Sequence, residues 1–390
     1  MICLLVATLW QAASPPLTLA NAWQAALDHR SVSRIVNADI AGATAGVRVA
    51  GQVPNPTMSA SYTGSVPRGH VLVDQPLSWL LTRGADRDAA RAALAGSRAD
   101  SAIQMAQFAG EVRRSFFGAV AAEARSRLLG EQQAVADSLV RIAHVRYAAG
   151  DISRFEAQQV ELESRVQSQA VLVALEELAV SRALLASLIG RSTADLLVLD
   201  GSLGAGLAER DSLPSDDELP VIIAALQDSV AAERTAASAA RARIPFPSIE
   251  AGTEWSDPSE AHATAVIGIA VPVPLWNRGG AQVAQARARA GQAAARTAEA
   301  RRTARQQLEA ARIRLRSAAA RAEFARDSLV PDGRSLRDRA LAAYRAGETG
   351  VVPVLEAIRR ERELELSAID AMVSYQGAVA SLHELIGVVP

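Results

Sequence analysis

Long stretches of helical character dominate the chain, and they are interrupted at only a few places. Proline is absent between Pro76 and Pro214 and again between Pro274 and Pro331, where Ala, Arg, Glu, Gln and Leu prevail. These residue types favour uninterrupted helix. A single helix over residues 83–147 would be roughly 95 to 100 Å long. The pattern therefore predicts an elongated helical structure, because such a helix does not fit into a compact domain.

A second helix is predicted to follow the first after a tight turn. Its apolar positions recur mostly at intervals of 7 or 4 residues, and they are Phe155, Leu162, Val166, Val173, Leu178, Leu185 and Ile189. This spacing is typical of a coiled-coil seam. Gly190 directly follows and is a common residue at the end of a helix.

Four short segments alternate between apolar and polar residues, as strands with one apolar face do. In residues 57–66 the apolar face carries Met58, Ala60, Tyr62, Gly64 and Val66, and the other face carries Thr and Ser. The later segments repeat this scheme with Ile249, Ala251, Thr253 and Trp255, and with Ala263, Ala265, Ile267, Ile269 and Val271. The segment 71–79 alternates less regularly, because Asp74 and Pro76 interrupt it.

The length of these predicted strands suits a membrane. Strands of about ten residues span the hydrocarbon of an outer membrane when tilted, and Trp79, Trp255 and Trp276 lie at strand ends, as interfacial aromatics do. Four strands are too few to close a barrel, and an open edge in lipid leaves backbone groups without partners. Three copies of the chain would supply twelve strands. A small sheet on a soluble coiled-coil protein is the alternative.

The chain also resembles itself at an offset near 197 residues. The clearest matches are the segments around Tyr147 and Tyr344, and in each copy 43 positions separate this tyrosine from a glycine, Gly190 or Gly387. Further matches pair residues 82–84 with 277–279 and residues 54–56 with 245–247. Each copy is therefore predicted to contain a helix, two strands, a long helix, a tight turn and a second long helix.

The duplication predicts the following layout. Residues 1–14 are predicted to be the remnant of a signal peptide. The first repeat, 17–190, contains a helix, strands at about 57–66 and 70–79, a long helix 83–147, a tip turn 148–152 and a helix 153–189. A linker follows at 191–218. The second repeat, 219–387, contains a helix, strands at about 248–257 and 263–274, a long helix 279–345, a tip turn 346–352 and a helix 353–386.

Composition narrows the possible functions. Hydrophobic residues make up 49% of the chain but aromatic residues only 4%, which indicates helices packed through small side chains such as alanine. The formal net charge of −1 argues against a nucleic-acid partner. All 41 basic residues are arginine, so lysine-dependent chemistry is excluded. Cys3 is the single cysteine, and no disulfide can form within the chain.

No sequence motif for catalysis or metal binding stands out. The five histidines show no paired spacing suited to a metal. No nucleophile motif, glycine-rich phosphate loop or acid/base pair is present either. We therefore expect neither an enzyme nor a resident cofactor.

Several ordered motifs resemble the TolC-like outer-membrane factor family of tripartite efflux and secretion systems. They cover nearly the whole chain and comprise residues 17–22 (LTLANA), 54–56 (PNP), 268–279 (GIAVPVPLWNRG) and the two turns 147–151 and 344–348. Residues 75–84 and 149–153 look most like the branch associated with heavy-metal cation efflux. The resemblance implies a mainly α protein with a transmembrane β part: a homotrimer with a twelve-stranded outer-membrane barrel continuous with a periplasmic barrel of twelve helices.

The resemblance also implies partners and sites. The helical tips would meet a periplasmic adaptor, a membrane fusion protein, which links the channel to an inner-membrane pump of the proton-driven resistance-nodulation-division type. By carry-over, the adaptor-contact residues are Tyr147, Gly150, Asp151, Tyr344, Gly347 and Glu348. Family members narrow the lower end of the tunnel with inward-facing charges, and Asp151, Arg154 and Glu348 are candidates for such a ring. The second tip, residues 347–350, differs from the first in sequence, and Pro353 follows it closely.

We therefore expect an outer-membrane exit channel that extends into the periplasm and conducts substrate passively. The cargo is not determined by the sequence, because a wide polar duct selects poorly; divalent metal cations are the cargo that the resemblance suggests. The alternative is a periplasmic coiled-coil adaptor or scaffold protein without a membrane barrel.

Overall fold

The structure is a computed structural model, which describes residues 16–64, 68–192, 198–204, 218–255 and 263–390. The predicted signal-peptide remnant, 1–14, lies outside the described residues. Among the helices described, none is both long enough and apolar enough to cross a membrane.

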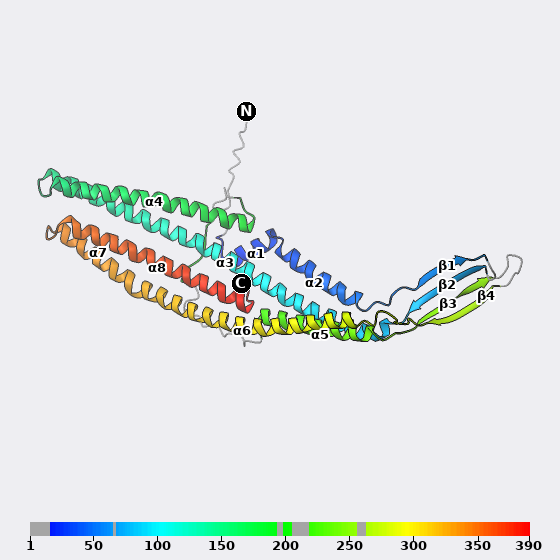
Figure 1. Cartoon of the computed structure of the whole chain (residues 1–390). Helices are drawn as coiled ribbons and strands as arrows, with labels where there is room; N and C mark the ends of the chain where they lie inside the picture. The colour runs from blue at the N-terminus through cyan, green and yellow to red at the C-terminus, as the bar shows by residue number, and fades with distance from the viewer. Residues whose placement is uncertain (1–15, 65–67, 193–197, 205–217, 256–262) are drawn as a thin grey trace, which may run out of the picture. The chain divides into compact units, whose positions relative to one another are not determined.

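The chain is mostly helical, with one small sheet (Figure 1). In chain order the elements are α1 (Leu19–His29), α2 (Val32–Val49), β1 (Thr57–Tyr62), β2 (Gly69–Pro76), α3 (Trp79–Ala148), α4 (Arg154–Ile189), α5 (Pro220–Ala242), β3 (Ser248–Trp255), β4 (Thr264–Ala270), α6 (Gly280–Phe324), the π-helix η2 (Ala325–Leu329), α7 (Val330–Arg345) and α8 (Val351–Ile386).

Contacts divide the chain into two compact units, each of which draws on both predicted repeats. Unit 1 consists of Met1–Ser33, Met105–Leu213 and Gln307–Pro390, and unit 2 of Arg34–Gln104 and Pro214–Gln306. The long helices α3 and α6 each contribute residues to both units.

Unit 2 contains an antiparallel sheet with the strand order β1-β2-β3-β4. The register aligns the apolar positions of all four strands: Met58 lies opposite Val73, Val73 opposite Ala251, and Ala251 opposite Ile267. Because side chains alternate along a strand, these residues share one face of the sheet. The next row, Ser59, Leu72, Gly252 and Val266, lies on the other face. Four antiparallel strands with one apolar face are therefore present, as predicted.

The strands are shorter than predicted at three ends. β1 ends at Tyr62, whereas 57–66 was expected, and residues 65–67 lie outside the described part of the chain. The expected strand 70–79 ends at Pro76, because Trp79 already begins α3. The expected strand 263–274 ends at Ala270, because the prolines that follow cannot donate to the ladder.

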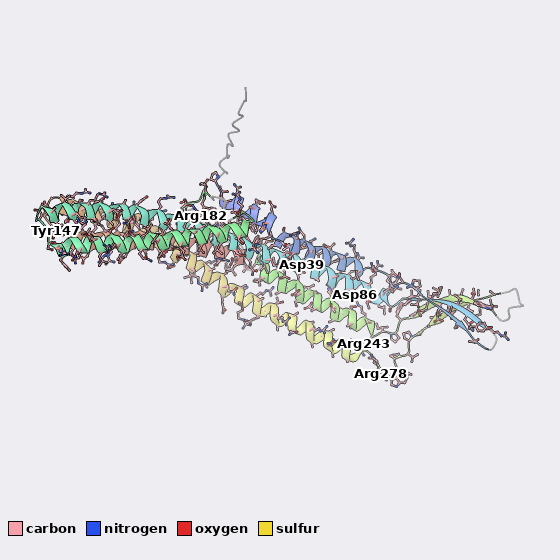
Figure 2. All side chains as sticks on the ribbon, turned by 90° about the horizontal axis from the view of Figure 1, so that it is seen from above. Asp39, Asp86, Tyr147, Arg182, Arg243 and Arg278 are labelled. Carbon is pink, nitrogen blue, oxygen red and sulfur yellow. The ribbon has the colours of Figure 1, made fainter. Side chains whose placement is uncertain are left out.

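A fixed turn connects β4 to α6 in unit 2. Arg243, which follows α5, donates from Nε to the carbonyl oxygen of Arg278 at 3.0 Å (Figure 2). The amide of Gly279 donates to Oδ1 of Asn277 at 2.9 Å, and Gly279 has a φ of 68°. Gly84, its counterpart in the predicted repeat, lies instead inside α3. The two Arg-Gly motifs are thus not structurally equivalent, and α3 begins four positions earlier than residue 83.

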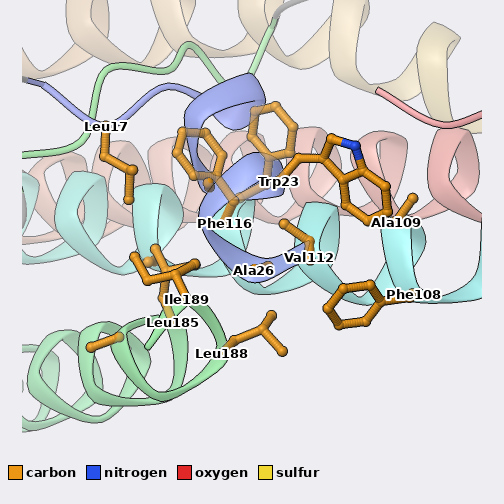
Figure 3. Close-up of a cluster of buried hydrophobic side chains, with 14 of the residues drawn as sticks. Leu17, Trp23, Ala26, Phe108, Ala109, Val112, Phe116, Leu185, Leu188 and Ile189 are labelled. Atoms are coloured by element: carbon orange, nitrogen blue, oxygen red, sulfur yellow. The ribbon is translucent and has the colours of Figure 1, made fainter. Parts of the chain in front are cut away.

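The core of unit 1 lies where α1 packs on α3 and α4 (Figure 3). Its buried side chains include Leu17, Trp23, Phe108, Val112, Phe116, Leu185 and Ile189. The predicted linker joins this core, because Leu17 pairs with Leu199 in a parallel bridge and Leu203 is buried. Residues 205–217 of that linker lie outside the described residues. Of the predicted α4 seam, Leu185 and Ile189 thus pack in this core, whereas four other seam residues are more than half exposed: Phe155, Leu162, Val166 and Val173.

The predicted helix 279–345 is not continuous. α6 passes into the five-residue π-helix η2, and α7 then begins at Val330 with Pro331 in its first turn. Proline lacks the amide hydrogen that an α-helix interior requires, and a π-turn is one way in which a helix absorbs such a local defect. α8 begins at Val351 rather than at 353, with Pro353 inside its first turn. α4 and α8 nevertheless have the same length, 36 residues.

Candidate functional site: the two hairpin tips

The first tip joins α3 to α4 through a turn that Gly150 makes possible. The amide of Gly150 donates to the carbonyl oxygen of Tyr147 at 3.0 Å, and the amide of Asp151 donates to that of Arg146 at 2.8 Å. This pair of bonds defines a Schellman motif, in which the residue after the C-cap is left-handed. Gly150 has a φ of 80°, and a residue with a Cβ atom would be strained there.

The second tip, between α7 and α8, repeats this geometry at the equivalent positions. The amide of Gly347 donates to the carbonyl oxygen of Tyr344 at 3.1 Å, and the amide of Glu348 donates to that of Ala343 at 2.9 Å. Gly347 has a φ of 79°. The two turns are therefore built alike, each around one left-handed glycine.

The helices that leave the two tips are capped differently. Ser153 caps α4 in a capping box: its side chain accepts from the amide of Glu156 at 3.2 Å, and Glu156 accepts from the amide of Ser153 at 2.9 Å. These hydrogen bonds, assisted by the charge of Arg146, lower the pKa of Glu156. The cap of α8 is Gly350, which has no side chain to donate or accept. α4 thus has a side-chain cap at the first tip, whereas α8 has none at the second.

The two tyrosines have different environments, although the repeat makes them equivalent. Tyr147 lies exposed at the α3–α4 tip (Figure 2), whereas Tyr344 is only 1% exposed. Tyr344 belongs to a buried apolar cluster that joins the two hairpins, with Leu139, Ala143, Val160, Val351, Val354, Leu355 and Ile358. Of the two, only Tyr147 exposes its ring; Tyr344 supports the tip from within.

Arg146 connects one tip to the other. Its guanidinium lies 4.8 Å from the centre of the Tyr344 ring, and Nη1 donates to the carbonyl oxygen of Tyr344 at 3.2 Å. That same oxygen accepts the turn amide of Gly347. One arginine of the first hairpin therefore binds both the ring and the capping motif of the second. Its equivalent in the second repeat is Ala343, so the repeat offers no matching arginine.

Removing this side chain is expected to loosen the second tip. For Arg146→Ala, the lost cation–π contact and charged hydrogen bond are together worth about 1–3 kcal/mol. Amide hydrogen exchange of residues 344–350 should then accelerate about ten-fold or more. Arg141→Ala is the matched control, since Arg141 is an exposed arginine of α3 that, among the residues described, donates to Ser138 of its own helix and to no residue of the second hairpin. Equal exchange in both variants would contradict the role given to Arg146.

The three residues predicted to form a charged ring are all exposed at the tips. Asp151 lies in the first turn, Arg154 begins α4 and Glu348 lies in the second turn. Within the described part of the chain, none of the three side chains forms an ion pair or hydrogen bond. They are thus available to a neighbouring copy, an adaptor or a passing ion, and a role in a ring stays a prediction.

Above the tips, charged and amide side chains link the hairpins. Glu163 of α4 pairs with Arg359 of α8 and lies 3.5 Å from Arg362. Arg362 also bonds the buried Gln167, whose amide group donates to the carbonyl oxygen of Leu129 at 3.0 Å. Further from the tips, Arg125 of α3 bonds Glu177 of α4 and Asp370 of α8. These contacts hold the two hairpins of one chain together over much of their length.

Glu361 is the most deeply buried acid of this region, at 1% exposed. Burial raises its pKa, and the nearby carboxylate of Glu365 adds to this effect, while Arg337 opposes it from 2.6 Å away. α7 and α8 approach each other closely here, since a Cβ added at Gly333 would lie 2.9 Å from Leu364 and 3.5 Å from the Cα atom of Glu361. Folding therefore favours the protonated form of Glu361 over the charged form.

This raised pKa predicts a dependence of stability on pH. An acid whose folded pKa lies above its unfolded value of about 4.5 binds protons more tightly when folded, so the protein gains stability as the pH falls through that window. Glu361→Gln removes this gain, and its melting temperature relative to the natural chain should be higher at pH 7 than at pH 4. Glu363→Gln, at an exposed residue of the same helix, should show no such change. An equal pH response in both variants would refute the assignment.

In the described ranges, no group of three or more His, Cys, Asp or Glu side chains is arranged to hold a metal ion. His70 lies 3.2 Å from Glu254 of the neighbouring strand.

Comparison with solved structures identifies the fold as that of outer-membrane channels. The chain matches the structure of CusC, described as forming a transmembrane channel, with a TM-score of 0.80, 16% identity and coverage of 94% of this chain and 91% of the other. It matches the outer membrane protein VceC from Vibrio cholerae with a TM-score of 0.77, 17% identity and coverage of 95% and 96%. At these identities the likeness concerns the fold alone.

Comparison of the sequence with known proteins also indicates outer-membrane efflux proteins. Residues 221–388, which correspond to the second predicted repeat, match the family "Outer membrane efflux protein". The cobalt-zinc-cadmium resistance protein CzcC of Cupriavidus metallidurans is 23% identical over 310 residues, covering 77% of this chain and 71% of that protein. The predicted resemblance is therefore confirmed: the chain is similar to outer-membrane efflux proteins over residues 221–388 and has the fold of outer-membrane channels.

Proposed function

We propose that this protein is the outer-membrane exit duct of a tripartite efflux system. Three copies assemble into a twelve-stranded barrel in the outer membrane and a twelve-helix tunnel in the periplasm. Substrate enters through the tips and leaves through the barrel without a catalytic step. Because the chain conducts passively, the energy for export comes from the inner-membrane pump.

The observation that carries this proposal is the sheet. Its register gathers apolar side chains from all four strands on one face, and Met58, Ile267 and Ile269 are each more than 70% exposed there. β1 and β4 have no outer neighbour within the described chain. An exposed apolar face and two open edges are unfavourable in water, and both are resolved when copies join edge to edge in lipid.

The tips supply the docking surface for the periplasmic adaptor. Tyr147, Asp151, Gly347 and Glu348 are exposed at the turns, and Gly150 fixes the shape of the first one. Tyr344 acts through Arg146 rather than by direct contact. By the resemblance, the adaptor is a membrane fusion protein, and the pump behind it is of the proton-driven resistance-nodulation-division type.

Divalent metal cations are the proposed cargo. Support comes from the relative named as a cobalt-zinc-cadmium resistance protein and from the motifs at 75–84 and 149–153. Exposed acids at each tip, Asp151 and Glu348, would attract cations to the tunnel entrance.

Reconstitution into a planar lipid bilayer tests the duct. The purified protein should produce discrete conductance steps of one size, with current carried by small cations. In cells, deletion of the gene should lower tolerance to cobalt, zinc or cadmium salts, and the plasmid-borne gene should restore it. Inserted protein that conducts nothing, in both lipid and cells, would refute the proposal; unchanged metal tolerance with normal conductance would refute only the cargo.

A further inference from the structure

A cavity of about 1070 Å³ lies in unit 2, where the sheet meets the ends of α5 and α6. One of its walls is the segment 271–276, here called the strap, which leads from β4 toward α6. Further lining residues come from the end of β2 and from the end of α5 with the segment after it, and they include Asp74, Pro76, Ala242, Arg243 and Phe246.

The strap is apolar and largely exposed. Val273 is 71%, Leu275 64% and Trp276 94% exposed. Pro272 and Pro274 lack amide hydrogens, so the strap cannot extend β4 as a regular ladder strand. A run of large apolar side chains of this kind marks a surface that another molecule covers.

The strap is also held in one conformation. The amide of Leu275 donates to the carbonyl oxygen of Val273 at 3.0 Å, and Asn277 and Arg243 fix the turn that follows. Gly279 has a φ of 68°, and an added Cβ would lie 2.7 Å from Arg243. The strap thus presents a formed surface to its partner, and ordering it costs little on binding.

We infer that the partner is residues 53–56 of a neighbouring copy of this chain. The inference rests on the proposed trimer, in which the free edge of β4 lies next to the free edge of β1 from the next copy. All pairings in the sheet are antiparallel, so the end of β4 and the start of β1 lie at the same end of the sheet. The residues before β1 in one copy therefore meet the residues after β4 in the next.

The chemistry of the two segments matches. Residues 53–56, Val-Pro-Asn-Pro, are exposed throughout, and Gln75 fixes them by donating to the carbonyl oxygen of Pro54 at 3.1 Å. Both segments carry two prolines separated by one residue. Neither can pair through a continuous ladder, so the contact is made by apolar side chains, with Val53 against the strap.

Contact within one chain is excluded by the sheet itself. β1 and β4 are its two opposite edges, three strand spacings or about 14 Å apart. A disulfide needs Cβ atoms about 3.5–4.5 Å apart. A bond between these segments can therefore form only between copies.

Paired cysteines test the inference in the full-length protein. In a Cys3→Ser background, Val53→Cys with Val273→Cys, and Asn55→Cys with Leu275→Cys, should each give a covalent trimer on a non-reducing gel after mild oxidation. A short bismaleimide should join the same pairs. Each single variant should stay monomeric on the gel. So should Val53→Cys with Ala265→Cys, because Ala265 lies at the opposite end of β4.

Light scattering of the same samples in detergent separates the possible failures. Trimers of normal mass that show no cross-link, with either cysteine pair and either reagent, would overturn the inference. The strap would then contact lipid, and the proposed function would stand. Monomers in detergent would contradict the proposed function and the inference with it.

Discussion

Replacing Ile267 with arginine is expected to remove the protein from the outer membrane. Ile267 is 84% exposed on the apolar face of the sheet, in the row shared with Met58, Val73 and Ala251. An arginine facing lipid near the bilayer midplane costs about 2–4 kcal/mol, and a trimer incurs this cost three times. Fractionation of cell envelopes should therefore show little or no Ile267→Arg protein in the outer membrane.

The control is the adjacent residue. Val266→Arg places the same side chain on the opposite face, in the row of Ser59, Leu72 and Gly252. That face would line the water-filled lumen, so the variant should insert at close to the natural level. If both variants insert equally, or both fail, the assignment of the two faces is wrong.

A bulky residue at Gly150 is expected to impair export without preventing assembly. The φ of 80° is left-handed, and a side chain there costs roughly 1–2 kcal/mol, more for a β-branched residue. An added Cβ meets no atom within 4 Å, so the cost arises from the backbone alone. Gly150→Val should reshape the adaptor-facing turn and lower metal tolerance several-fold, while the trimer still forms.

Gly130→Val provides the comparison. Gly130 lies in α3 with helical backbone angles, and it too has open space at its Cβ position. This substitution should leave export near its natural level. Normal metal tolerance in Gly150→Val cells, with natural amounts of protein in the outer membrane, would contradict the role of the turn.

The local features of this fold could be predicted because they depend on short-range rules. The turns at Gly150 and Gly347 follow from a glycine placed after a long helical stretch, and the structure has left-handed glycines at both positions. The alternation of apolar and polar residues along each strand is likewise a short-range pattern, because it repeats every two residues. Even β2, which Asp74 and Pro76 made ambiguous, was predicted close to its true position.

What could not be predicted depends on packing between distant segments. Tyr147 and Tyr344 occupy matching positions in the repeat, yet only the packing of one hairpin on the other buries Tyr344. Arg146 differs visibly from Ala343 in the sequence, but its contact with Tyr344 joins residues nearly two hundred positions apart. The sequence predicted one uninterrupted helix over 279–345, whereas the structure places the π-helix η2 between α6 and α7, just before Pro331.

The mass of the protein extracted from outer membranes tests the central claim most directly. Light scattering in detergent, corrected for bound detergent, should give three times the mass of one chain. This result is expected because four strands with two open edges per copy require partners to close. A protein that is recovered from the periplasm as a monomer, and that stays soluble without detergent, would contradict the account.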